Sequence, residues 1–208
     1  MHDRRIDGET QVFGNAGALF MNAMTWYDHE TESIWSQPWG RAIQGELKGV
    51  QLRVLPSQVT TWAAWKTEHP ETLVMTNDAD RVIFRQEFNE NFVIGLLLDD
   101  LSKAYYYSDV QEEVVVNDML GDVPVVIWAA DNNFHVFARQ VGDMILTFDP
   151  ISGGMKDKET GTIWNVALGI GMAGPLEGEF LLPVPSTSSY DWAWSDFYPQ
   201  AEFYSPEG

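Results

Sequence analysis

Short apolar segments separated by turn residues run along most of the chain. β-Branched and aromatic residues gather in runs of five to ten residues bounded by Gly, Asp, Asn or Pro, which is the pattern of strands joined by turns. The runs cover residues 11–20, 51–56, 72–76, 81–88, 91–98, 112–118, 123–130, 134–141 and 144–149. This dense spacing predicts a mainly β fold of short antiparallel strands with a few helical turns, arranged as a sandwich or an irregular barrel.

Helical periodicity is confined to two stretches. Residues 60–70 read "TTWAAWKTEHP" and residues 190–199 read "YDWAWSDFYP", and each stretch ends near a proline. Because proline cannot continue a helix, we expect one short helix in each stretch.

The chain is an internal duplication. At an offset of 129 residues, positions 28–75 align with 157–204 without a gap, and 15 of the 48 pairs are identical, where average composition would give about three. Residues 3–13 align with 138–148 at an offset of 135, so the second copy has lost six residues. We expect the two copies to share one substructure. In it, the mostly buried pairs are Trp35 with Trp164 and Trp65 with Trp194.

The boundary between the copies is expected at "TNDADR", residues 76–81. This gives a first copy over 1–80 and a second copy over 81–208, as separate domains or as one fused globule. The strand-rich block 92–126 has no counterpart before residue 3, so we expect the first copy to lack its N-terminal half.

Charge and composition exclude several classes of protein. The 31 acidic residues outnumber the 12 basic ones, for a net charge of −19, which argues against binding to nucleic acid or to an anionic membrane. Cysteine is absent, which excludes disulfides and thiolate chemistry. No apolar run approaches the roughly 20 residues of a membrane span. The charged start "MHDRRIDGE" does not fit a signal peptide.

The best-repeated motif has two interpretations. "DHETESIW" at 28–35 recurs as "DKETGTIW" at 157–164. The acids could form catalytic or cation-binding pairs, Asp28 with Glu30 and Asp157 with Glu159. They could also make local turn hydrogen bonds beside a buried Trp. We favour the structural role, because a catalytic pair rarely needs a twin.

Candidate ligand-binding residues are few. Histidines 2, 29, 69 and 135 lack metal-ligand spacing, although His135 with Asp131 could flank a cation. The acidic "NDAD" at 77–80 lacks the glycine and distal Glu of a calcium loop. We therefore predict no metal and no cofactor. Trp62 and Trp192 stay open as an exposed stacking platform for sugars or apolar ligands, whereas Trp65 and Trp194 are expected in the core.

Long segments of both copies resemble domain-of-unknown-function family 3179. They are "DRRIDGETQVFGNAGALF" and "GRAIQGELKGVQLRVLPSQVTTWAAWKTEHPETLV" in the first copy, and "DKETGTIW" and "GPLEGEFLLPVPSTSSYDWAWSDFYPQAEFY" in the second. The resemblance spans Asp3 to Tyr204. It implies an exported or membrane-anchored protein without an established activity.

The chain departs from that family at one motif. Members carry a Cys-Pro-Leu-x-Gly-like segment just before the "F-x-R-x-V" strand. Its Cys falls at Trp128 here, where the chain reads "WAADNNFH". Any family activity that depends on this Cys is absent from this chain.

Two functions follow as hypotheses. The first is a non-catalytic extracytoplasmic module that assembles with itself or binds a partner. The second is a carbohydrate-active or metal-assisted hydrolase that uses Asp or Glu beside an aromatic cleft. The strand-like segment 3–13 would be free to pair in trans, which predicts a homo-oligomer formed by strand-edge pairing.

The acidic composition generates a testable prediction. Self-repulsion among 19 excess negative charges destabilises the folded state, and salt screens it with a Debye length of about 10 Å at 0.1 M. We expect Tm to rise as sodium chloride is added from low ionic strength, measured by circular dichroism. A flat or falling Tm would contradict this view of the surface.

Overall fold

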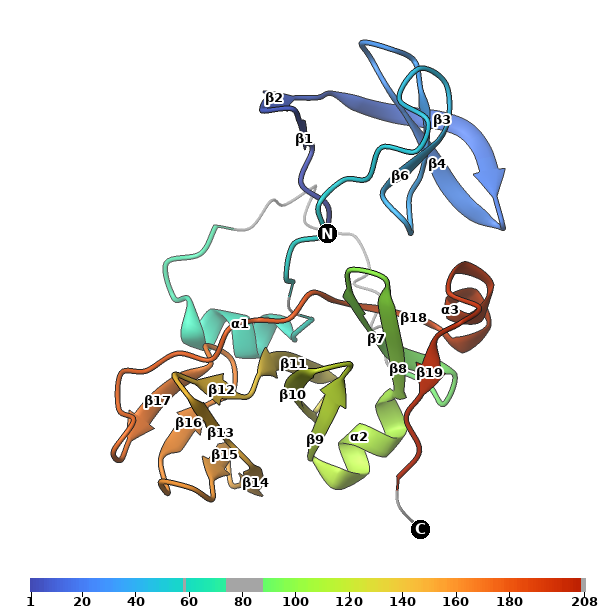
Figure 1. Ribbon diagram of the computed structural model, residues 1–208. Coiled ribbons are helices and arrows are strands. Elements are labelled where there is room, and N and C mark those ends of the chain that lie inside the picture. Colours follow the sequence, from blue (N-terminus) through green and yellow to red (C-terminus); the bar gives the residue numbers. More distant parts are fainter. Residues whose placement is uncertain (58, 74–87, 207–208) are drawn as a thin grey trace, which may run out of the picture. The chain divides into compact units, whose positions relative to one another are not determined.

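The protein is mainly β, as the sequence predicts. The computed structural model describes residues 1–57, 59–73 and 88–206 (Figure 1). Their strands form six small sheets of two to four strands, and among these residues no sheet closes into a barrel. Several predicted features lie wholly or mostly outside the described residues: the boundary at 76–81, the "NDAD" segment at 77–80 and the strands at 72–76 and 81–88.

The chain divides into two compact units. Unit 1 is built from Met1–Ser57 and Trp192–Gln200, and unit 2 from the described residues within Gln58–Asp191 and Ala201–Gly208. Each unit therefore takes most of its residues from one copy of the repeat and a short segment from the other copy.

Unit 1 centres on a four-stranded antiparallel sheet. Its strands follow in the order β3 (Phe13–Phe20), β4 (Ala23–Asp28), β5 (Ile34–Ser36) and β6 (Arg41–Gln44). The buried centre of this sheet consists of Trp35, Ala42 and Leu52. A small hairpin of β1 (Arg5–Ile6) and β2 (Glu9–Thr10) precedes the sheet.

The N-terminal segment is paired within its own chain. Residues 3–13 contain the β1–β2 hairpin, the Gln11 N–H donates to the Arg4 carbonyl, and Phe13 pairs with Asp28. The bridge between His2 and Val54 fixes the chain start. The expectation that 3–13 is left without a partner in its own chain is therefore wrong, since its strands pair within the chain.

Unit 2 contains a sheet that is buried on both faces. β10 (Val123–Ala130) lies between β9 (Val115–Leu120) and β11 (Asn133–Ala138). Alternate residues of β10 enter two different apolar clusters, Val125 and Ile127 in one and Val126 and Trp128 in the other. The unbroken apolar run of β10 follows from this double burial.

The first of these clusters is completed by a second sheet and a helix. The sheet has the order β18 (Ser186–Tyr190), β7 (Phe92–Leu98), β8 (Leu101–Tyr106) and β19 (Glu202–Phe203). Helix α2 (Tyr107–Glu113) packs against β7, β8, β9 and β10 (Figure 1). The sequence did not predict α2, because its buried Tyr107 and Val110 stand in a run of aromatic and β-branched residues typical of strands.

Between residues 140 and 173 the second copy repeats strands β1–β6 of the first copy. The hairpin of β12 (Gln140–Val141) and β13 (Met144–Ile145) matches β1 and β2. The sheet of β14 (Phe148–Ile151), β15 (Gly154–Asp157), β16 (Ile163–Asn165) and β17 (Ile170–Ala173) matches β3–β6. The six residues that the second copy lacks belong to the hairpin of β3 and β4, since these two strands are longer than β14 and β15.

The two helices of the repeat are exchanged between the units. Helix α1 (Trp62–Glu68) belongs to unit 2, whereas Trp192–Phe197 of α3 (Asp191–Phe197) belongs to unit 1. Trp35 and Trp164 are buried as expected, and so is Trp194. Trp65 is only half-buried, because its face borders a cavity.

A buried carboxylate in each copy explains why the eight-residue motif at 28–35 recurs at 157–164. Asp157 accepts a hydrogen bond from Trp164 Nε1 at 2.9 Å and from the Thr160 amide at 2.6 Å. Asp28 accepts from Trp35 Nε1 and Thr31 at the same two distances. Burial disfavours ionisation of both carboxylates, but the hydrogen bonds outweigh it and lower the pKa of each. The structural role of this motif accounts for its duplication.

A glycine completes the motif in each copy. Gly45 (φ +97°) and Gly174 (φ +127°) adopt backbone conformations that other residues rarely take. A Cβ at Gly174 would lie 2.8 Å from the Thr162 Cα. This close approach lets the Thr162 hydroxyl accept from the Leu176 amide, as Ser33 does from Leu47.

The carboxylate network yields a prediction for stability. Asp157→Asn places an amide N–H₂ opposite N–H donors, so at least one buried donor loses its partner. We expect the free energy of unfolding to fall by roughly 2–4 kcal/mol in urea denaturation, and the same for Asp28→Asn. Asp149→Asn is the control, because it changes an exposed ion pair with Lys158 worth at most about 1 kcal/mol. Equal effects of Asp157→Asn and Asp149→Asn would contradict the role of the network.

Candidate ligand-binding site

Unit 2 contains a cavity of about 240 Å³ beneath helix α1. The helix, the β10–β11 hairpin and the turn after β16 form its walls. The residues that line it are Thr60, Ala64, Trp65, Thr67, Glu68, His69, Trp128, Asn133, His135, Val166 and Ala167.

Strand β11 holds the start of α1 in place. Val59 forms a bridge with Phe134, and the Thr61 N–H donates to Asn133 Oδ1 at 2.6 Å. The Thr61 side chain caps the helix by accepting from the Ala64 N–H. The segment before the helix is thereby tied to the strand that supplies His135.

The β10–β11 hairpin places His135 opposite Trp128. The two residues are direct cross-strand partners, and their ring centroids lie 5.7 Å apart. Asp131 and Asn132 form the two-residue turn, with φ of 51° and 59°, as tight hairpins require. Since Asn133 lies two residues before His135, both side chains leave β11 on the same face.

His135 is a buried, neutral imidazole at neutral pH. The residue is 4% exposed, and burial lowers its pKa to about 4. Its Nδ1 is buried and has no hydrogen-bond partner in the part of the chain that the structure describes. An unpartnered buried polar atom is uncommon in proteins; among the described residues Gln11, Ser36 and Trp194 also carry one, but only that of His135 belongs to a residue that lines this cavity.

Helix α1 contributes two rings in tilted contact to the opposite wall. Trp65 and His69 lie one helical turn apart with centroids at 4.0 Å. The Trp65 indole N–H donates to Thr72 Oγ1, which fixes the ring. Among the described residues, Glu68 is the only acidic residue that lines this cavity.

Unit 1 carries an aromatic pair at two related positions of the repeat. Trp39 and Phe197 stand at the positions of Leu168 and Glu68 in the repeat alignment. Their rings meet edge to face at 5.4 Å, and Trp39 Nε1 donates to the Phe197 carbonyl. The duplication therefore provides an internal comparison, in which one copy carries an aromatic pair and the other copy carries a cavity.

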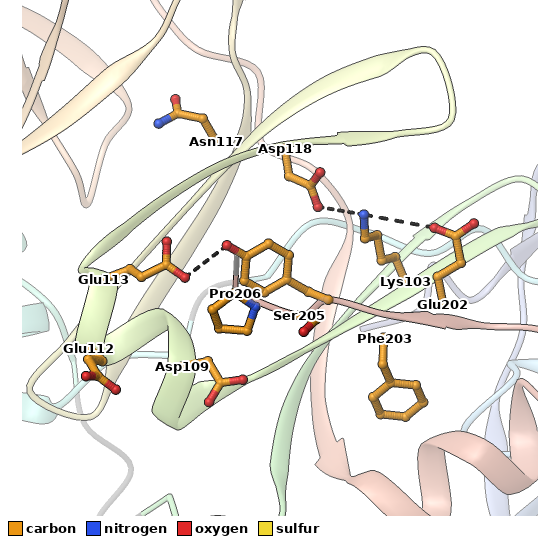
Figure 2. A pocket seen from close by; sticks show the side chains of 11 residues that line it. Lys103, Asp109, Glu112, Glu113, Asn117, Asp118, Glu202, Phe203, Ser205 and Pro206 are labelled. Atoms are coloured by element: carbon orange, nitrogen blue, oxygen red, sulfur yellow. Dashed lines mark hydrogen bonds and ion pairs between the residues drawn. The ribbon is translucent and has the colours of Figure 1, made fainter. Parts of the chain in front are cut away.

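A second, larger hollow of about 830 Å³ lies elsewhere in unit 2 (Figure 2). It is lined by α2, by β8 and β9 and by the C-terminal segment, with five acids and one Lys: Asp109, Glu112, Glu113, Asp118, Glu202 and Lys103. Figure 2 shows Lys103 between Asp118 and Glu202. The Lys103 Nζ lies 2.7 Å from Asp118 and 4.0 Å from Glu202. The Tyr204 hydroxyl donates to Glu113 at 2.9 Å.

The acids of this hollow are largely engaged in structural contacts. Asp118 also accepts from the Tyr105 hydroxyl, and although burial opposes it, Lys103 lowers the pKa of Asp118. A general acid at neutral pH needs a raised pKa. Asp118 is therefore suited to hold Lys103 and Tyr105 and unsuited to donate a proton.

The predicted site residues do not converge. Of the four, only His135 lines the cavity; Trp62 and Trp192 are half-exposed, and Asp131 is an exposed turn residue. Glu159 accepts from the Thr147 N–H, which is a structural contact. Within the described ranges, no three His, Asp or Glu residues are grouped to hold a metal. The described part of the chain also has no helix long and apolar enough to span a membrane.

Comparison with known proteins defines the family. The profile of the family described as proteins of unknown function, DUF3179, matches residues 1–88 and again residues 85–201. The chain therefore belongs to the DUF3179 family and carries its domain twice. No curated protein and no solved structure matches the chain. Trp128, where the family resemblance placed a Cys, lines the cavity.

The burial of His135 predicts a dependence of stability on pH. The unfolded chain takes up a proton near pH 6.5, whereas the folded protein does so only near pH 4. The contribution of the neutral His135 to the free energy of unfolding is therefore complete above pH 6.5. As the pH falls to 4, the protein loses up to about 3 kcal/mol of this free energy.

We expect the free energy of unfolding to fall less in His135→Phe than in the wild type between pH 7 and pH 4, because the variant has no imidazole to protonate. Urea denaturation at each pH measures this free energy for both proteins. His29→Gln removes an exposed imidazole and serves as the control. Parallel curves for the wild type and His135→Phe would show that His135 is not buried as a neutral group.

Proposed function

We propose that this chain is a non-catalytic binding module that works outside the cytoplasm and takes a small ligand into the cavity beneath α1. The observation that carries the proposal is the unpartnered, buried imidazole of His135 in a cavity walled by Trp65 and Trp128. Apolar cavities with few polar groups are the usual form of small-molecule sites. The location outside the cytoplasm is supported by the family resemblance alone.

The internal comparison supports binding over a packing defect. A void in a core costs stability, and the first copy carries Trp39 and Phe197 at the corresponding positions. Unit 2 has Leu168 and Glu68 at these positions, and Glu68 lines an open space beside a buried polar group. A role in binding accounts for this difference.

Other partners are less well supported. A homo-oligomer formed by strand-edge pairing loses its main support, since residues 3–13 pair internally. A carbohydrate on an exposed platform would use Trp62, which is 51% exposed and lies outside the cavity. A hydrolase would use the acidic hollow, whose Asp118 and Glu113 are already bonded to Lys103 and Tyr204.

The duplication suggests a direct test of binding in the cavity. The double variant Glu68→Phe/Leu168→Trp copies the aromatic pair of unit 1 into unit 2 and should close the cavity. We expect the wild type to bind small aromatic compounds in an NMR fragment screen, with shifts at His135 and Trp128, and the double variant to lose this binding.

Trp62→Ala is the matched control, because Trp62 lies on the same helix outside the cavity. Its binding should equal that of the wild type. Loss of binding in Trp62→Ala with retention in the double variant would favour the exposed platform and reject the cavity.

A further inference from the structure

The size of the cavity limits its ligand to one or two rings. At about 240 Å³ it exceeds the roughly 150 Å³ of an apolar cavity that holds benzene. It is smaller than the roughly 300 Å³ at which sites for drug-sized ligands begin.

The walls favour a flat and uncharged ligand. Trp65 and Trp128 offer ring faces, against which an aromatic ligand gains contact area at little entropic cost. The Glu68 carboxylate at the wall repels anions. Transfer of any charged group to this partly apolar space costs free energy that no described counter-charge other than Glu68 offsets.

Two polar groups on one face of β11 give the cavity its specificity. Asn133 uses its carbonyl oxygen to accept from the Thr61 N–H, which leaves its amide N–H₂ as a donor. His135 is neutral, so one of its ring nitrogens is an acceptor, and no hydrogen bond to this ring occurs among the described residues. A ligand that donates a hydrogen bond would satisfy the imidazole.

We propose that the cavity selects a neutral one- or two-ring aromatic ligand carrying an N–H or O–H donor, which the His135 imidazole accepts. This inference rests on the proposed function and adds the chemical class of the ligand.

A matched pair of probes tests the role of the donor in the unaltered protein. Indole and benzothiophene have nearly the same shape, but only indole carries an N–H. We expect indole to bind roughly fivefold to tenfold more tightly in NMR titrations, as one net hydrogen bond provides. Since both probes are measured on the wild type, the result does not depend on a variant that folds.

The variant His135→Phe keeps a ring of similar shape and removes the acceptor. We expect the affinity ratio of the two probes to fall to about one in this variant. Equal affinities in the wild type would overturn the role of His135 and leave the cavity as a general aromatic site. Absence of binding for both probes would overturn this inference together with the proposed function.

Discussion

Each copy of the repeat depends on one buried carboxylate that accepts an indole N–H. Asp28 with Trp35, and Asp157 with Trp164, lie at the centre of a four-stranded sheet, and all four side chains are at most 1% exposed. A charge in such a place is tolerated only when it is fully hydrogen-bonded. The hydroxyl of the turn threonine, Thr31 or Thr160, bonds to the carboxylate. It also forms a hydrogen bond with the hydroxyl of Ser33 or Thr162. These in turn accept from the backbone of the glycine-containing loop.

This network accounts for part of the sequence that recurs between the copies. Asp28, Thr31 and Trp35 recur because they form it. Ala64 and Trp65 also recur, and in unit 2 they line the cavity. The residues that distinguish the cavity are those where the copies differ or where the second copy has no counterpart. Glu68 stands opposite Phe197 in the alignment, and His135 lies on a strand outside the 28–75 and 157–204 alignment. A duplicated scaffold can thus keep its stability in both copies while one copy acquires a site.

The fold was largely predictable and the site only in part. The strand runs, the two repeated helices and the buried Trp residues follow from periodicity and duplication. The indole–carboxylate bond does not, because spacing along the chain leaves side-chain partners undetermined. The sequence is sufficient to pair Trp128 with His135, since a two-residue turn at Asp131–Asn132 fixes the register of the two strands. The approach of α1 to β11 was not predictable, because it joins residues 72 positions apart through Thr61 and Asn133.

The exchange of helices explains how the cavity comes to lie in unit 2. Helix α1 comes from the first copy but packs in unit 2, where Val59 and Thr61 bind to β11. Trp65 therefore faces a hairpin that brings polar His135 and Asn133. Trp194, its counterpart in α3, is buried in unit 1, where Trp39 and Phe197 fill the neighbouring space. Each tryptophan contacts the ring of the residue one helical turn further on, Trp65 that of His69 and Trp194 that of Tyr198. The wall opposite each helix and the last residue of the helix, Glu68 or Phe197, thus distinguish the cavity of unit 2 from the packed aromatic pair of unit 1.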